Sequence, residues 1–469
     1  PSPGIKASLH GVLGGWRAFT GTFGAGLAGY RGIEGILQER LIDMSAQPDA
    51  EIARLRDTPA AGAIGTCRYK LHDENREDFQ RAIDVFKAHN VGYFFYIGGN
   101  DSMDTAAKLA VLASERGIDL RVIGVPKTID NDVGDPEFEK MDHTPGYGSA
   151  ARYWAYIIQN LDEENRGMSP SEPVAVVQAM GRSSGFIPAA ARLADPKRDI
   201  PLQIYLAESG YGLEALAERV NARLTRDGRC IVVVSEGFHA GSLGESHDSF
   251  GHVEYGASKT NVAQKVTNYL NDHGLTVRGN ATSQVPGALQ RGTSIFASAV
   301  DREEAYEVGR HAVTLAVEGL TGMMATITRA GGVPWAVVTS ASGATDTDTA
   351  ATPPPSPAPP SIEEAIRTYR PIYGHVGLAE VANFHRVLPA HWLDANEPDV
   401  TDHFTAYAAP LIGDTWPHAP IENALQRFAR IEPRLTEQRL PAYVPMNYRS
   451  LVPGAAFARW DNDGDTERR

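Results

Sequence analysis

The chain has 469 residues and an acidic balance, with 44 Lys and Arg against 58 Asp and Glu, for a formal net charge of −14. That length is enough for two domains with full cores, and the negative charge argues against nucleic acid or an anionic membrane as a partner. Only two cysteines, Cys67 and Cys230, are present and no apolar run reaches the length of a membrane span, so we expect a protein of the reducing cytoplasm.

Apolar runs alternate with helical patterns through the first two thirds of the chain. The run at 91–97 precedes a helical pattern at 102–117, and a second run follows at 120–125. Two further runs, at 173–180 and 229–237, predict buried strands. Continuous Val and Ile between helices are typical of parallel strands that are covered on both faces. The pattern predicts a doubly wound α/β architecture, in which ligands bind beyond the carboxyl ends of the strands.

Residues 342–361 differ from the rest of the chain, because they are rich in Pro, Ala, Thr and Ser. Such a low-complexity segment does not supply the apolar side chains that a core needs. We expect an exposed and largely unstructured insertion, after which a helical pattern resumes.

The first polar cluster lies in "YIGGNDSMDTA" (96–106), where a strand runs into a helix through Gly98 and Gly99. Their backbone can approach a ligand closely, and the free N–H groups of a helix start, near Ser102 as its cap, suit a phosphate. Asn100 and Asp101 offer oxygen ligands for Mg²⁺. Taken alone, the segment fits an ordinary strand-to-helix turn equally well.

The second polar cluster, "PKTIDND" (126–132), follows the next strand and adds Lys127, Thr128, Asp130 and Asp132. A solvated Asx-turn would use the same residue types. Phosphoryl transfer needs a cation on the phosphate, an oxygen ligand for Mg²⁺ and a carboxylate that accepts a hydroxyl proton. This loop supplies all three, and the two loops together are more specific than either one.

A rival interpretation comes from "GRSSG" (181–185), which matches the G-x-S-x-G turn of serine hydrolases with Ser183 as the nucleophile. The context is favourable, since a strand precedes the turn and a helical pattern follows it. The mechanism also needs an acid and then a histidine downstream, for which Asp248 and His252 are candidates without a distinctive setting. The hydrolase interpretation leaves both earlier loops unexplained.

Four further side chains are candidates with an ordinary alternative. Glu236 in "SEGF" ends a buried strand, where it can bind a sugar hydroxyl or cap the next turn. Arg291 in "PGALQRG" and Arg68 in "GTCRYK" can each hold a phosphate, although most arginines lie on the surface. His143 is a lone histidine, which is more often structural than catalytic.

Together these segments resemble the phosphofructokinase family, and most of all its pyrophosphate-dependent branch. "GGNDSMDTA", "PKTIDND", "HTPGYGSAARYWA", "MGRSSG", "SEG" and "PGALQRG" occur in the family's order. The resemblance covers nearly the whole chain except the Pro-rich insertion and the tail. It implies two similar doubly wound α/β domains with the active site in the cleft between them. The implied ranges are 1–148 with about 291–341 for the donor and magnesium domain, and 149–290 with about 362–460 for the sugar-phosphate domain.

The resemblance also implies roles for the transfer loops. Asp130 would be the base that takes the proton from the sugar's 1-hydroxyl, supported by Asp132, and Thr128 would contact the transferred phosphoryl group. Asn100 stands where the family places a magnesium-ligating acid or amide, so Mg²⁺ is the implied cofactor. Lys127 completes the catalytic set.

Donor and acceptor contacts follow from the same resemblance. Asp101 and Lys127 stand where ATP-using members carry glycine, which implies pyrophosphate as the donor. The other implied donor contacts are Arg68, Gly98, Gly99 and Ser102. The implied sugar-phosphate contacts are Met180, Gly181, Arg182, Glu236 and Arg291, which makes "GRSSG" a sugar-binding turn.

The sequence departs from the family mainly around the acceptor. Family members often carry arginines near Pro173 and Thr282 that reach the sugar phosphate of a neighbouring subunit, and this chain has none there. Lys6 stands in "PGIKASL" where an Asn is usual. The transfer loops therefore look intact, while the acceptor pocket looks altered.

The resulting prediction is a magnesium-dependent transfer of phosphate from pyrophosphate to the 1-hydroxyl of fructose 6-phosphate, in a cytoplasmic homodimer or homotetramer without nucleic-acid or membrane partners. A related kinase for another sugar phosphate, such as sedoheptulose 7-phosphate, or one that uses ATP, is the alternative within the class. Outside it stand the serine hydrolase and a non-catalytic regulatory paralogue.

Overall fold

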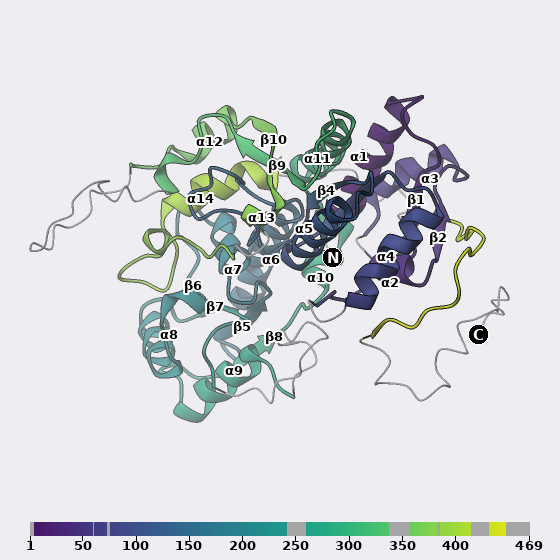
Figure 1. The fold of residues 1–469 in the computed structure, drawn as a ribbon. Coiled ribbons are helices and arrows are strands. Elements are labelled where there is room, and N and C mark those ends of the chain that lie inside the picture. Colours follow the sequence, from purple (N-terminus) through teal and green to yellow (C-terminus); the bar gives the residue numbers. More distant parts are fainter. Residues whose placement is uncertain are drawn as a thin grey trace, which may run out of the picture.

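The computed structural model describes residues 4–59, 61–72, 76–241, 259–336, 357–381, 385–413 and 431–446. These residues form two four-stranded sheets and one two-stranded sheet, with helices packed against them (Figure 1). Residues 342–356 of the predicted insertion lie outside the described part of the chain. None of the described helices is both long and apolar enough to cross a membrane.

The first sheet has the strand order β10-β9-β4-β3. Strands β3 (Tyr93–Gly98) and β4 (Arg121–Pro126) pair in parallel, and β4 also pairs in parallel with β9 (Met323–Arg329). The edge strand β10 (Pro371–Gly377) runs antiparallel to β9. The predicted strands at 91–97 and 120–125 are confirmed, and their carboxyl ends lie at one edge of the sheet.

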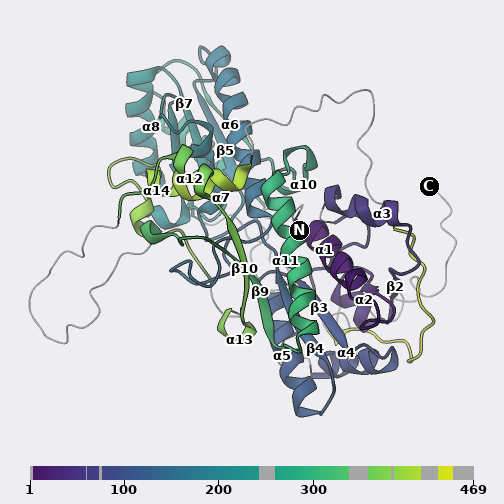
Figure 2. The ribbon, with the colours of Figure 1, turned by 90° about the horizontal axis from the view of Figure 1, so that it is seen from above.

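The second sheet is parallel throughout, in the order β6-β7-β5-β8. The side chains of β5 (Val174–Ala179) and β7 (Cys230–Ser235) are buried along their whole length, as their Val-rich runs predict. The flanking strands, β6 (Leu202–Tyr205) and β8 (Ala281–Gln284), complete the sheet. Figure 2 shows β5 and β7 on one side of the molecule and β3, β4, β9 and β10 on the other.

Helices surround both sheets. Those before the second sheet are α1 (Gly4–Ala18), α2 (Ile33–Leu37), α3 (Asp49–Arg54), α4 (Arg76–Ala88), α5 (Asn100–Glu115) and α6 (Tyr147–Met168). Those that follow are α7 (Phe186–Ala189), α8 (Leu213–Asp227), α9 (Val262–His273), α10 (Leu289–Gly292), α11 (Ala299–Val317), α12 (Ile362–Thr368), α13 (Leu378–Val381) and α14 (Asp402–Ala408). The short strands β1 (Leu27–Gly29) and β2 (Leu41–Asp43) form the antiparallel third sheet.

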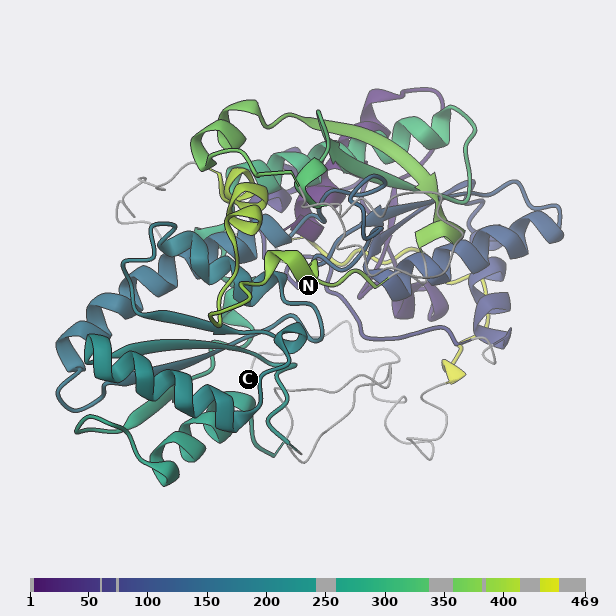
Figure 3. The ribbon, with the colours of Figure 1, turned by 90° about the vertical axis from the view of Figure 1, so that its left-hand side faces the viewer.

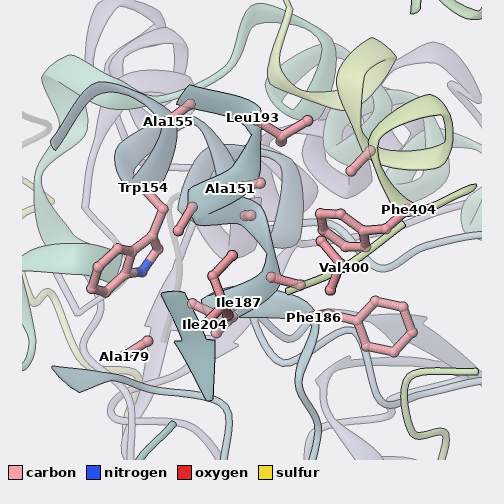
Figure 4. Packing of buried hydrophobic residues seen from close by; sticks show 14 of the residues in the cluster. Ala151, Trp154, Ala155, Ala179, Phe186, Ile187, Leu193, Ile204, Val400 and Phe404 are labelled. Atoms are coloured by element: carbon pink, nitrogen blue, oxygen red, sulfur yellow. The ribbon is translucent and has the colours of Figure 1, made fainter. Parts of the chain in front are cut away.

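A large apolar core lies between the second sheet and the C-terminal segment. Trp154 of α6, Phe186 of α7 and Ile204 of β6 pack there with Val400 and Phe404, and each is almost fully buried (Figure 4). At about 25 cal/mol per Å² of apolar surface removed from water, aromatic side chains of this size dominate the stabilisation of a core. This core fixes α7 and hence the turn at 180–185 that precedes it.

Helices α1 and α11 cross at very close range because glycines face each other's backbone. A Cβ at Gly11 would lie 1.9 Å from the Tyr306 carbonyl oxygen, and one at Gly309 would lie 2.3 Å from the Ser8 carbonyl oxygen. Side chains at either position would therefore force the helices apart. The close crossing fixes the N-terminal turn of α1, and with it Lys6.

The last third of the chain contributes to both halves of the molecule. β10 was expected with the second domain, as part of 362–460, but it pairs with β9 in the first sheet (the long green strand in Figure 3). Trp392 then packs in the core of the second sheet, whereas Ile431 packs with Ile42 and Leu55 near the N-terminal helices. Residues 447–460 lie outside the described residues, and the domain boundaries stay a prediction.

Candidate active site

The loops that follow β3 and β4 lie side by side. The Lys127 N–H donates a 2.8 Å hydrogen bond to the Gly98 carbonyl, which extends the parallel pairing of the two strands by one step. Ligand sites of open α/β sheets form at such an edge. The two polar clusters of the sequence are thereby brought together.

The two glycines of the first loop have different surroundings. A Cβ at Gly98 would lie 2.0 Å from the Ser102 Oγ, so this position makes room for a neighbouring side chain. The nearest atom to a Cβ at Gly99 would be the Lys127 carbonyl oxygen at 3.7 Å, and Gly99 is the N-cap of α5. Ser102 was expected near the cap, and it lies in the first turn of the helix.

Asn131, which the sequence reasoning did not single out, shapes the second loop. It is fully buried, and its φ of +58° is a left-handed conformation that Asn tolerates better than most residues. Its Oδ1 accepts the Thr144 N–H at 3.0 Å, and its Nδ2 donates to the Tyr407 hydroxyl at 2.8 Å. An Asn between two Asp was the available signal for this anchor.

One cavity of about 1650 Å³ joins the two polar loops to residues of the second sheet. Its lining includes every predicted site residue except Gly181, namely Arg68, Gly98, Gly99, Asn100, Asp101, Ser102, Lys127, Thr128, Asp130, Asp132, Met180, Arg182, Glu236 and Arg291. Residues from segments more than 200 positions apart in the sequence are therefore neighbours around one space. Catalytic groups in proteins are commonly assembled in such a cleft.

Arg182 links the two sides of this cavity. Its Nε and Nη2 lie 3.2 and 3.1 Å from the Asp130 Oδ2, and its Nη2 lies 3.7 Å from the Asp132 Oδ2. The residue has a φ of +51°, an uncommon conformation for a side chain of this size. A strained backbone that is retained at a cleft requires support from its surroundings.

Glu236 supplies that support. Its Oε1 accepts the N–H groups of Gly181 at 3.1 Å and of Arg182 at 2.9 Å, so the carboxylate closes the turn from beneath. Burial raises the pKa of Glu236 to about 7, an effect that the two backbone hydrogen bonds oppose. The Met180 N–H donates to the Gln290 Oε1 at 3.0 Å, which ties the turn to the Arg291 segment.

The two carboxylates of the second loop differ in pKa. Burial raises the pKa of Asp130, and the neighbouring charge of Asp132 adds to the rise, while Arg182 opposes it. Burial also acts on Asp132, but its hydrogen bond to His385 and the charge of Arg182 outweigh it and hold its pKa below the usual value. Two nearby carboxylates with diverging pKa values suit a division between a base and an ionised partner.

Cations surround the same space. Burial lowers the pKa of Lys127, and Arg291 adds to the effect. Burial also lowers the pKa of Lys6 to about 7, with a further contribution from Lys127. Burial lowers the pKa of Arg291, and the positive charge of Arg68 lowers it further. Four cations that repel one another across a cleft are stabilised by a polyanion, which is the expected behaviour of a phosphate site.

The chain is similar in sequence to known proteins along most of its length. The Phosphofructokinase family model matches residues 1–316. A pyrophosphate–fructose 6-phosphate 1-phosphotransferase of Halomonas elongata is 34% identical over 449 residues, which cover 94% of this chain and 96% of that protein. The chain belongs to the phosphofructokinase family.

Further relatives of the phosphofructokinase family agree with this placement. An enzyme of the same name from Xanthomonas campestris pv. campestris is 34% identical and spans 94% of this chain and 96% of its own length. The crystal structure of a pyrophosphate-dependent phosphofructokinase from Nitrosospira multiformis superimposes with a TM-score of 0.76 at 32% identity, covering 94% and 97% of the two chains. The protein is a phosphotransferase of this family and acts on small molecules.

Asn100, the predicted magnesium ligand, carries an unpaired atom. The Oδ1 of Asn100 is buried and has no hydrogen-bond partner among the described residues. No cluster of three or more His, Cys, Asp or Glu side chains suited to a metal occurs in that part of the chain. Mg²⁺ takes oxygen ligands, often one or two from the protein and the rest from water and phosphate. The single amide oxygen fits that kind of site.

His385 was missed by the sequence reasoning. Its Nε2 lies 2.8 Å from the Ser183 Oγ, and its Nδ1 lies 3.2 Å from the Asp132 Oδ2. It follows "LAEVANF", in a segment that resembles the C-terminal part of the family but to which we assigned no site residue. The earlier partners considered for Ser183, Asp248 and His252, lie outside the described residues.

Two other predicted side chains have charged partners. His143 is buried between Asp142 and Glu304, with 2.7 Å from each ring nitrogen to a carboxylate oxygen, as expected of a structural histidine. Asp101 forms a 2.6 Å ion pair with Lys70. The charge of Asp101 is therefore already balanced within the donor side of the cavity.

Proposed function

We propose that the chain transfers a phosphoryl group from pyrophosphate to the 1-hydroxyl of fructose 6-phosphate. The observation that carries this proposal is the position of Asp130, a buried carboxylate of raised pKa at the point where the donor loops meet the Met180–Ser183 turn. The names and high coverage of the relatives support the same donor and acceptor.

The chemistry follows from the contacts. Asp130 accepts the proton of the acceptor hydroxyl, whose oxygen then bonds to the nearer phosphorus of pyrophosphate. The bridging P–O bond breaks, and inorganic phosphate leaves with its negative charge next to Lys127 and Lys6. Thr128 is well placed for the transferred group, since its Oγ1 already accepts the Asp130 N–H at 3.1 Å and its hydroxyl hydrogen remains available.

The acceptor side consists of the Met180–Ser183 turn, Glu236 and Arg291. The Arg291 guanidinium has no hydrogen-bond or ion-pair partner among the described residues, and the nearby Arg68 raises the local positive charge. A guanidinium in this state can take a phosphate with two parallel hydrogen bonds. Arg291 is therefore the proposed anchor for the sugar's own phosphate, and Glu236 the contact for a sugar hydroxyl.

Mg²⁺ is the cofactor that the resemblance to the phosphofructokinase family implies. We assign Asn100 as its protein ligand, because its Oδ1 is buried without a partner among the described residues. When bound, the ion would neutralise charge on the donor phosphates. The carboxylates and cations described above do the positioning and proton transfer.

A donor-by-acceptor activity screen of the whole chain tests the proposal. Pyrophosphate and ATP are each offered with fructose 6-phosphate, sedoheptulose 7-phosphate and unphosphorylated fructose. We expect the highest kcat/KM for pyrophosphate with fructose 6-phosphate. A clear preference for ATP or for another sugar phosphate would replace that part of the proposal, and no turnover with any pair would favour a regulatory paralogue. The cytoplasmic location and the homo-oligomeric state stay predictions.

A further inference from the structure

Asp132, Ser183 and His385 form a connected group at the edge of the active-site cavity. They come from the loop after β4, the turn after β5 and the segment after α13, and the three line the same space. The His385 ring bridges the other two, at 3.2 Å to the Asp132 Oδ2 and 2.8 Å to the Ser183 Oγ. The proposed transfer assigns no role to His385 or to the side chain of Ser183, so their placement requires its own explanation.

The geometry matches a nucleophile, a base and an orienting acid, but a serine hydrolase also needs donors for the oxyanion. Around Ser183 those donors are already engaged. The N–H groups of Gly181 and Arg182 donate to Glu236, the Ser184 N–H donates to the Gly181 carbonyl, and the Gly185 N–H donates to Glu208. These four N–H groups of the turn are therefore not available to stabilise the oxyanion of acyl transfer.

The charge around His385 favours its protonated form. Asp132 lies against one ring nitrogen, and Asp130 and Glu208 are further anions nearby, whereas the cation Arg182 opposes them. The hydrogen bond to Asp132 raises the pKa of His385, although partial burial acts the other way. A protonated ring donates from both nitrogens.

We propose that His385 is a positioning residue for the acceptor: its charged ring donates one N–H to Asp132 and the other to Ser183. The first contact keeps Asp132 ionised beside the base Asp130. The second occupies a lone pair of the Ser183 oxygen, so that the hydroxyl hydrogen of Ser183 points to the cavity and is donated to a hydroxyl oxygen of the acceptor sugar. Ser183 is exposed to that cavity.

This inference rests on the proposed function, because acceptor kinetics are its first readout. The favourable form of His385 exists below its raised pKa and is lost as the pH rises through that pKa. In the wild type, kcat/KM for the acceptor should therefore fall on the alkaline side. His385→Gln should lower that kcat/KM about tenfold, as expected for a lost charged hydrogen bond, and should remove the alkaline fall.

Two further variants separate the contacts. Ser183→Ala should lower kcat/KM for the acceptor several-fold and keep the alkaline fall, because Asp132 still depends on His385. The KM for pyrophosphate should stay at the wild-type value in both variants. His375→Gln, an exposed histidine on β10 outside the cavity, is the matched control and should behave as the wild type.

An NMR titration of the histidine ring protons needs no turnover and separates this inference from the proposed function. His385, assigned by its absence in His385→Gln, should titrate above its ordinary pKa and move down in Asp132→Asn. If the protein is inactive with every substrate pair but His385 titrates as expected, the proposed function is wrong and the Asp132–His385 contact is supported. An unshifted titration, or an alkaline fall that persists in His385→Gln, would overturn the inference, and wild-type acceptor kinetics in Ser183→Ala would overturn its Ser183 part.

Discussion

The cavity joins two regions whose side chains are held in different ways. On the transfer side, the loops after β3 and β4 are tied by backbone hydrogen bonds at one sheet edge, and Lys127 and Asp130 both belong to the loop after β4. On the acceptor side, Glu236 supports the Met180–Ser183 turn from below and Arg182 reaches across to Asp130. Strand geometry sets the first region, and charged contacts between distant segments set the second.

This difference has a consequence for substrate binding. Lys127 and Lys6 on the transfer side are cations whose pKa values are lowered, so a bound polyanion would relieve their repulsion. The guanidinium of Arg182, in contrast, is engaged with Asp130 before any acceptor arrives. An anionic acceptor must share or replace that contact. We therefore expect changes on the transfer side to act on kcat and those on the acceptor side to act on KM.

The largest expected effect tests the transfer side. Asp130→Asn keeps the shape of the side chain and its hydrogen bonds to Arg182 in part, but it removes the base. Loss of a general base costs about 10²–10⁴ in rate, so kcat should fall by that factor with little change in the KM for pyrophosphate. Steady-state assays with both substrates varied measure this.

Asp104→Asn is the matched control, since Asp104 pairs with Lys108 on α5 and does not line the cavity. It should keep wild-type kinetics. A near-native kcat in Asp130→Asn combined with an inactive Ser183→Ala would contradict the assignment of the base and return Ser183 to the role of nucleophile.

The next effect concerns the choice of donor. A carboxylate at Asp101 next to the α-phosphate of a nucleotide is a like-charge contact, which can cost several kcal/mol. Asp101→Gly with Lys127→Gly should therefore lower kcat/KM for pyrophosphate by about a hundredfold or more and reduce the preference over ATP. Competition between the two donors in one reaction measures the ratio directly.

The ion pair between Asp101 and Lys70 sharpens this prediction. Lys70→Met leaves the Asp101 carboxylate without that partner, so the site should reject both donors more strongly and the ratio between them should rise. If Lys70→Met instead improves the use of ATP, Asp101 does not exclude nucleotides by charge.

The transfer side is also the region that sequence reasoning predicted best. The strands 91–97 and 120–125 carry continuous apolar runs, and Gly98, Gly99 and the Asp-rich loop follow them directly. Each of these signals acts over a few residues, and the parallel pairing of the two strands brings the loops together without further information. Local pattern and topology are sufficient for this half of the site.

The acceptor side could be predicted only in part, since its contacts depend on pairings that no local pattern encodes. Arg182 and Glu236 were predicted from the sequence as site residues. Nothing in the sequence indicated that Glu236 would accept the N–H groups of the Arg182 turn, or that Arg182 would bind Asp130. His385 reaches Ser183 across 202 positions, and β10 joins the first sheet after an insertion of low complexity. Such contacts follow from the packing of the whole chain.

A smaller effect is expected from the phosphate anchor. Arg291→Ala removes a charged hydrogen-bond donor that is worth roughly 1.5–3 kcal/mol, so KM for fructose 6-phosphate should rise about ten- to a hundredfold. The KM for pyrophosphate should not change. Arg291→Lys keeps the charge and loses the two-pronged geometry, and we expect it to recover only part of the loss.

Unphosphorylated fructose provides the control for this assignment. It has no phosphate for Arg291 to hold, so its kcat/KM should be low in the wild type and unchanged by the substitution. Equal use of the two sugars by the wild type, or an Arg291→Ala variant that does not distinguish them, would show that the acceptor's phosphate binds elsewhere.

The smallest effect on turnover tests how the acceptor turn is supported. Glu236→Gln keeps an oxygen that can accept the N–H groups of Gly181 and Arg182, so the turn should persist and kcat should change by less than about tenfold. The charge is lost, however. In the wild type Glu236 has a pKa of about 7, and it becomes the stronger, ionised acceptor as the pH rises through that value. KM for the acceptor should therefore fall between pH 6 and pH 8 in the wild type and vary less in Glu236→Gln.

The same group makes a prediction about stability with a defined sign. Because the folded-state pKa of Glu236 is above the ordinary carboxyl value, the folded chain binds more protons than the unfolded chain between pH 4.5 and about 7. The contribution of Glu236 to the free energy of unfolding thus decreases as the pH rises across that range, by a few kcal/mol at most at about 1.4 kcal/mol per pKa unit. Glu236→Gln should gain stability relative to the wild type on going from pH 5 to pH 8, whereas Glu115→Gln, at the exposed end of α5, should not. Denaturant unfolding at both pH values decides this.

The difference in the free energy of unfolding between Glu236→Gln and the wild type could instead be the same at pH 5 and pH 8. That result would mean that the carboxylate beneath the turn is not held at a raised pKa, and that the turn is supported by its hydrogen bonds alone.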